Sequence, residues 1–208
     1  MLDRLTLRLV RPPLLRMARY TVRVGVTADH VTLLGFAIGM LALPALATGH
    51  FTAALLAIGL NRILDGLDGA VARLTQATER GAYLDVVLDF IFYSAVIFGF
   101  ALADPGRNAL PAAGLIFAFV GTGSSFLAFA VFAERFALHS MRYPNKGFYY
   151  LTGIAEGTET IGFFVLMCLL PSAFPTLAWV FFGLCVLTTL SRVVGGAHTL
   201  KALAKTPQ

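Results

Sequence analysis

Residues 65–89 read DGLDGAVARLTQATERGAYLDVVLD, and apolar sequence lies on both sides of this stretch. It contains two pairs of carboxylates, Asp65 with Asp68 and Asp85 with Asp89. Side chains three or four positions apart lie on one face of a helix, so each pair presents two acids in the same direction. The polar residues 74–80 predict a turn that folds the second pair back against the first. The stretch therefore predicts a helical hairpin with four facing carboxylates.

The composition around this hairpin is that of a membrane protein. The chain has 208 residues, of which 58% are hydrophobic and 13% charged, and its mean hydropathy is +0.79. Soluble domains carry about 25% charged residues, so we expect one all-α membrane domain over residues 26–208. Cys168 and Cys185 lie in apolar runs without metal-ligand spacing and are expected to be packing residues. The composition indicates a lipid environment and no nucleic-acid partner.

Six apolar stretches are long enough, or nearly so, to cross a hydrocarbon core that needs about 20 helical residues. They cover residues 31–47, 51–72, 82–103, 109–133, 148–170 and 176–199. With six spans, all of the 16 Lys and Arg residues except Arg107 fall on one face. Cytoplasmic loops carry the excess of basic residues. We therefore expect a bacterial inner membrane protein with both termini in the cytoplasm and a polar cavity open to that side.

The first 25 residues contain six arginines between recurring Leu, Val and Met residues. This pattern predicts an amphipathic segment in the membrane interface, broken at Pro12 and Pro13, with its arginines toward anionic head groups. A solvated basic arm is the alternative. A cleavable signal peptide is not expected, because the segment lacks a continuous apolar core.

Four carboxylates in this apolar setting repel one another unless positive charge compensates them. Divalent cations would make the hairpin a metal site, and ionisable residues within membrane spans are functional candidates by default. In the alternative, Arg62, Arg73 and Arg80 would neutralise the acids in a structural set of ion pairs. Apolar residues pack as well without such a cost, so we favour the metal site.

The hairpin also matches the signature D-x-x-D-G-x-x-A-R, seven or eight residues, then G-x-x-x-D-x-x-x-D. The matching residues are Asp65, Asp68, Gly69, Ala72, Arg73, Gly81, Asp85 and Asp89. In these positions the chain resembles the CDP-alcohol phosphotransferase family. The resemblance implies a homodimeric enzyme that moves a phosphate-linked alcohol group from a CDP-alcohol, in the first instance CDP-diacylglycerol, onto an acceptor hydroxyl. CMP is released, and the product is a phospholipid.

The resemblance also implies roles for the acids. Asp65, Asp68 and Asp85 would hold two divalent cations, Mg²⁺ or Mn²⁺, that bridge the diphosphate of the donor. Asp89 would contribute to the second cation and act as general base on the acceptor hydroxyl. These roles agree with what the chemistry requires, because displacing CMP needs neutralised phosphates and a base beside the incoming oxygen.

Residues 27–32, TADHVT, resemble the family's T-P-N-x-x-T, which is associated with the nucleotide pocket. Ala and Asp replace Pro and Asn, so only the last threonine is carried over, and Asp29 fits better as the N-cap of the first span. Gly69 and Ala72 of the signature are small, which would let the cytosine base or the ribose of the nucleotide approach the helix. Close packing between helices explains these small residues equally well. Gly81 is expected to begin the third span. The predicted nucleotide site comprises Thr32, Gly69, Ala72, Arg73 and Gly81.

The acceptor side is expected near the fifth span. Glu156 and Glu159 are three residues apart, which places them on one face of a helix, and acids in lipid are rarely without a role. Glu156 and the glycine that follows it also resemble the element that contains the fifth-span glutamate of the choline and ethanolamine phosphotransferase branch. Both features favour an uncharged or cationic alcohol. A phosphorylated acceptor would instead need basic side chains to bind its phosphate. The nearby basic residues in the preceding loop are Arg135 and Lys146.

Two other functions are compatible with acids in a membrane. A membrane prenyltransferase also binds a diphosphate through aspartate-rich helices and Mg²⁺, but it usually has more spans and two distant acidic segments. A cation transporter would use the carboxylates as a pathway, yet the acids gather near one face with no matching set on the other.

Overall fold

The computed structural model describes residues 3–136 and 153–203, and this part of the chain is entirely helical. In chain order the helices are α1 (Asp3–Arg23), α2 (Ala28–Met40), α3 (Ala42–Ala47), α4 (Phe51–Leu74), α5 (Glu79–Ala103), α6 (Pro105–Arg135), α7 (Gly157–Leu169), the 3-10 turn η1 (Pro171–Ala173) and α8 (Phe174–Leu203). The expected all-α membrane class is confirmed.

Four helical stretches in the described residues are long and apolar enough to cross a membrane: Ala28–Ala47, Glu79–Ala103, Pro105–Arg135 and Pro171–Ala202. Their outward side chains are apolar, as Leu110, Phe117 and Val131 on α6 illustrate. The predicted second span coincides with α4, which is 24 residues long and carries Arg62, Asp65 and Asp68 in its second half. Arg62, Asp65 and Asp68 line the hollow of the site described below.

The predicted fifth span, residues 148–170, was wrong over residues 153–156, which are not helical; its first five residues lie outside the described residues. Within the described residues the helix begins only at Gly157 and has 13 residues, which is about 20 Å of helix against a hydrocarbon core of about 30 Å. The backbone N–H groups of Ile154 and Ala155 donate instead to the hydroxyl of Thr188 on α8, at 3.1 and 2.9 Å. Non-helical backbone is tolerated at such depth where protein groups satisfy it.

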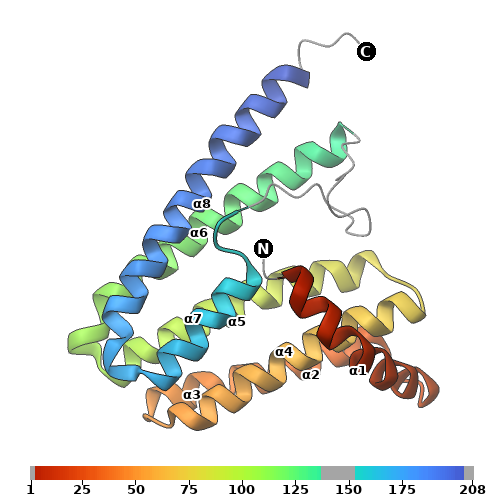
Figure 1. The fold of residues 1–208 in the computed structure, drawn as a ribbon, viewed down its shortest axis with the longest axis horizontal. Helices are drawn as coiled ribbons and strands as arrows, with labels where there is room; N and C mark the ends of the chain where they lie inside the picture. The colour runs from red at the N-terminus through yellow and green to blue at the C-terminus, as the bar shows by residue number, and fades with distance from the viewer. Residues whose placement is uncertain (1–2, 137–152, 204–208) are drawn as a thin grey trace.

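The N-terminal segment was predicted to be broken at its two prolines, and this was also wrong. Helix α1 continues through Pro12 and Pro13, although an interior proline removes one backbone hydrogen bond of the helix. Ala18 of α1 is fully buried against a small core with Val31 of α2 and Leu67 of α4. Figure 1 shows α1, in red, crossing the ends of α2 and α4.

The helix starts are set by local capping. Thr27, and not Asp29 as predicted, is the N-cap of α2, since its side chain and that of His30 form a capping box. Thr78 caps α5 and accepts a hydrogen bond from Gly81 N at 3.0 Å. Helix α5 therefore begins two residues before Gly81, and the predicted turn shortens to the residues between Leu74 and Glu79.

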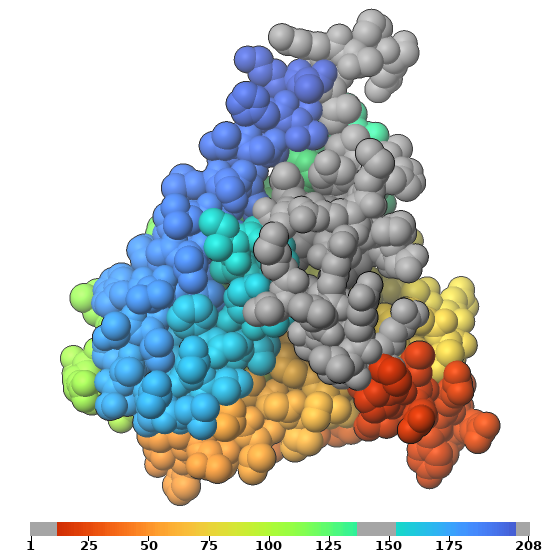
Figure 2. Space-filling model, viewed as in Figure 1, coloured from red at the N-terminus to blue at the C-terminus, as the bar shows by residue number. Residues whose placement is uncertain are grey.

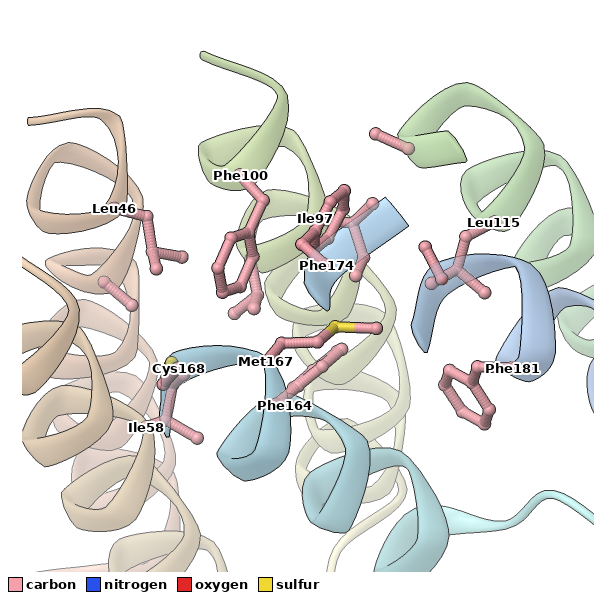
Figure 3. Close-up of a cluster of buried hydrophobic side chains, with 14 of the residues drawn as sticks. Leu46, Ile58, Ile97, Phe100, Leu115, Phe164, Met167, Cys168, Phe174 and Phe181 are labelled. Carbon is pink, nitrogen blue, oxygen red and sulfur yellow. The ribbon is translucent and has the colours of Figure 1, made fainter. Parts of the chain in front are cut away.

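The main core lies where α3, α4, α5, α6, α7 and α8 converge. Figure 3 shows Leu46, Ile58, Phe100, Phe164 and Phe181 pointing toward one another from five different helices. Helices α6 and α8 pack along each other and extend together beyond the other helices in Figure 1. In the space-filling view, α7 and α8 lie next to each other and α3 lies along the lower edge (Figure 2).

Candidate metal centre

Three of the four predicted acids come together. One carboxylate oxygen from each of Asp65, Asp68 and Asp85 lies within 4.8 Å of the others. Asp65 and Asp68 are one helical turn apart on α4, and Asp85 faces them from the start of α5. Asp68 is 6% exposed, whereas Asp85 is open to the surface. Hard cations such as Mg²⁺ and Mn²⁺ prefer carboxylate oxygens, so the donor set of this cluster fits the expected metal.

The cluster lies in a hollow of about 250 Å³, counted with the open space at its mouth. Its wall comes from α2, α4 and α5: Thr32, Gly35, Phe36, Asn61, Arg62, Asp65, Asp68, Asp85, Leu88 and Asp89. The hydroxyl of Thr32 lies 2.6 Å from Asp68 Oδ2 and donates a hydrogen bond to it. Helix α2 thus orients one carboxylate of the cluster.

Asp89 lies in the same hollow but makes different contacts. Arg62 Nη2 is 2.6 Å from Asp89 Oδ1, and Arg62 Nη1 is 3.4 Å from Asp89 Oδ2. The Tyr93 hydroxyl donates to Asp89 Oδ2 at 3.0 Å. Arg62 Nη1 is also 3.6 Å from Asp65 Oδ2. The alternative in which arginines neutralise the acids is therefore present in part, because Arg62 pairs with Asp89 and Asp65.

The roles of Asn61 and Tyr93 were missed from sequence. Asn61 is 4% exposed; its amide donates to Gly35 O at 2.9 Å, and its carbonyl oxygen accepts from Arg62 Nε and Nη2 at 2.8 and 2.6 Å. The only sequence signal for Asn61 was the polar pair that it forms with Arg62, with two residues between this pair and the start of the signature at Asp65. Nothing in the helical spacing indicated that this pair would contact α2 and α5.

Of the residues predicted for the nucleotide site, only Thr32 is among those that line the hollow. A Cβ at Gly69 would lie 3.3 Å from Arg73 Nη1, so the guanidinium of Arg73 folds back along the helix toward Gly69. A Cβ at Gly81 would lie 3.1 Å from Asp29 Oδ1. Gly81 therefore permits close approach of α5 to the Asp29 side chain at the start of α2. Ala72 is half-buried on α4.

The predicted acceptor residues are not gathered at the hollow. Glu156 is the N-cap of α7 and so lies outside the helix on which it was placed; its carboxylate accepts from Gly153 N at 3.1 Å. The Glu159 carboxylate accepts from Glu156 N at 3.2 Å. Both acids therefore satisfy backbone donors at a helix start. Arg135 is exposed at the end of α6, and Lys146 lies outside the described residues.

The fold and the site together define a helical membrane protein with a carboxylate-lined hollow of the kind that binds divalent cations. A family model described as CDP-alcohol phosphatidyltransferase matches residues 25–191. The chain belongs to this family. It is a membrane transferase of phospholipid synthesis, as the resemblance implied.

Two named relatives are similar to the chain. The chain is 53% identical over 205 residues to the inner membrane protein YnjF of Escherichia coli (strain K12), covering 99% of this chain and 100% of that protein. It is 32% identical over 94 residues to an archaetidylinositol phosphate synthase of Pyrococcus horikoshii, covering 45% of this chain and 50% of that one. An inner membrane location is thus found in a relative that matches along its full length.

Solved structures share the fold. The phosphatidylinositol phosphate synthase of Mycobacterium tuberculosis with CDP-DAG bound superposes with a TM-score of 0.67 at 23% identity, covering 88% of this chain and 92% of that one. A structure of the same enzyme with manganese and citrate gives a TM-score of 0.67 over 88% of each chain, again at 23% identity.

Proposed function

We propose that this enzyme transfers the phosphatidyl group of CDP-diacylglycerol to the hydroxyl of an alcohol and releases CMP. The observation that supports this most directly is the convergence of Asp65, Asp68 and Asp85 in a hollow of a CDP-alcohol phosphatidyltransferase family chain. A membrane prenyltransferase or a cation transporter would have no reason to carry the complete family signature.

In the proposed reaction the acceptor oxygen forms a bond to the phosphorus of the phosphatidyl group. The bond from that phosphorus to the CMP oxygen breaks, and CMP leaves with the electron pair. Asp65, Asp68, Asp85 and Asp89 would hold two divalent cations, Mg²⁺ or Mn²⁺. When bound, these cations supply charge neutralisation for the diphosphate and for the leaving CMP.

Asp89 is proposed as the group that takes the proton of the acceptor hydroxyl. Its contacts with Arg62 and Tyr93 orient the carboxylate, and a carboxylate has about four lone-pair directions, so further acceptor capacity remains. Thr32, Gly69, Ala72, Arg73 and Gly81 are proposed to line the nucleotide side.

The architecture proposed around the site has six spans, with α7 as a short fifth one. Both termini would lie in the cytoplasm, since the hollow and nearly all basic residues share one face. A cysteine introduced in the Arg80 turn should then react with an impermeant thiol reagent only from the cytoplasmic side. The homodimer is proposed on family likeness, and cross-linking in native membranes tests it.

The decisive experiment uses purified protein in detergent with CDP-diacylglycerol and Mg²⁺ or Mn²⁺, scored by CMP release. Because the carboxylates of Glu156 and Glu159 are engaged with backbone N–H groups, they give less support to an uncharged or cationic acceptor. The panel therefore compares inositol phosphate and glycerol 3-phosphate with serine, choline and glycerol.

Asp65→Asn and Asp89→Asn should abolish turnover while the protein still inserts in the membrane. Activity retained in Asp89→Asn would remove the general-base role. If none of these acceptors leads to CMP release from CDP-diacylglycerol, the proposed function is refuted.

A further inference from the structure

Arg62 is a cation inside the hollow that is not part of the family signature. Its guanidinium lies between Asp89, with Nη2 2.6 Å from Oδ1, and Asp65, with Nη1 3.6 Å from Oδ2. Only 17% of its side chain is exposed. It therefore adds a fixed positive charge to a site whose other charged wall residues are the four aspartates.

Arg62 is held in this position from several sides. The carbonyl oxygen of Asn61 accepts from its Nε and Nη2 groups, and the Tyr93 hydroxyl accepts from Nη1 at 3.2 Å. The guanidinium carbon lies 5.2 Å from the Phe92 ring centre and 5.5 Å from that of Tyr93, within cation–π range. A side chain so held loses little further entropy when it pairs with Asp89.

We propose that Arg62 is a resident counter-charge that limits the empty enzyme to one divalent cation, bound at Asp65, Asp68 and Asp85. The second cation binds only when the diphosphate of the donor brings further negative charge. This inference rests on the proposed function, because it concerns the same site and the same donor.

Charge balance in a low-dielectric hollow is the physical reason. Four aspartates and Arg62 together carry three negative charges, so one divalent cation leaves one negative charge. A second cation would leave net positive charge with no partner, which is costly away from water. The diphosphate removes that excess. Without Arg62, two cations would balance the four carboxylates, and the second would bind without any substrate.

The test is a Mn²⁺ titration of the purified full-length enzyme in detergent without donor or acceptor, with free Mn²⁺ measured by electron paramagnetic resonance. The wild type is expected to bind one Mn²⁺ and Arg62→Gln two, with first-ion affinity raised by about tenfold or more. Arg62→Lys keeps the charge and should bind one. The matched control is Arg80→Gln, which removes an arginine whose side chain is 73% exposed and pairs with Asp29 outside the hollow; it should also bind one.

A second measurement needs no variant. CDP added to the wild type should raise the bound Mn²⁺ from one to two, after subtraction of binding to CDP in buffer. Two ions on the empty wild type, or the same number and affinity in Arg62→Gln as in the wild type, would overturn the counter-charge role. No Mn²⁺ bound to the wild type with or without CDP would instead overturn the metal site of the proposed function.

A role of Arg62 confined to joining α4 to α5 would change the melting temperature of the variants but not the number of ions they bind. The count of bound Mn²⁺ in folded protein, checked by its elution volume and circular dichroism, separates the two roles.

Discussion

Gly39→Ala is the substitution whose effect the structure defines most closely. A Cβ at this position would lie 2.8 Å from Asn61 Nδ2, 2.9 Å from Asn61 Cγ and 3.0 Å from Phe92 Cδ2. Asn61 is buried, and its amide donates to Gly35 O on the same helix as Gly39. The added methyl group therefore has to displace a side chain that is held on both sides.

Two costs follow. Overpacking of this kind costs about 1–3 kcal/mol. If the amide moves away, the hydrogen bond to Gly35 is lost and a buried polar group is left unsatisfied, at about 1–3 kcal/mol. At about 2–4 °C per kcal/mol for a chain of this size, we expect the apparent melting temperature to fall by at least about 2 °C from overpacking alone and by at least about 4 °C if both costs apply. Arg62, which Asn61 orients, should shift with it, so CMP release should fall as well.

The matched control is Gly59→Ala on α4, where an added Cβ meets nothing within 4 Å. Alanine is favoured over glycine inside a helix by about 0.5–1 kcal/mol, so this variant should be as stable as the wild type or slightly more stable. Thermal unfolding followed by circular dichroism in detergent compares the two. The double variant Gly39→Ala/Asn61→Ala should lose less stability than the two single variants added together, because the clash with the Asn61 side chain is gone. A Gly39→Ala protein that melts with the wild type would refute the reasoning.

Three further outcomes are expected. Thr32→Val removes the 2.6 Å hydrogen bond to Asp68 and should weaken Mn²⁺ binding by about 10–100-fold, as loss of outer-shell partners does; unchanged affinity would mean that Asp68 needs no help from α2. Chelation with EDTA should abolish CMP release, with recovery on adding Mg²⁺ or Mn²⁺; activity that survives chelation speaks against the metal site. Glu156→Gln keeps an acceptor for Gly153 N and should lower stability by less than about 1 kcal/mol without changing the preferred acceptor. A changed acceptor preference would restore Glu156 to the acceptor site.

Local sequence rules predicted the acidic hairpin well. Asp65 and Asp68 share a face because helical spacing alone decides it, and the polar turn before α5 is short enough to return Asp85 to them. Rules of the same kind failed where a group distant in sequence binds backbone N–H groups that a helix would otherwise use. Residues 153–156 are apolar enough to read as helix, but Thr188 on α8 takes two of their N–H groups.

The sequence by itself determined the class of protein, the membrane setting and the identity of the four acids, because composition and helical periodicity are properties of neighbouring residues. Only the tertiary structure decided that Asp89 pairs with Arg62 while the other three acids face one another. It also decided that Asn61 contacts α2 and that Gly39 leaves room for it. These contacts join different helices, and their geometry depends on how close the helix axes approach, which no spacing along one chain segment encodes.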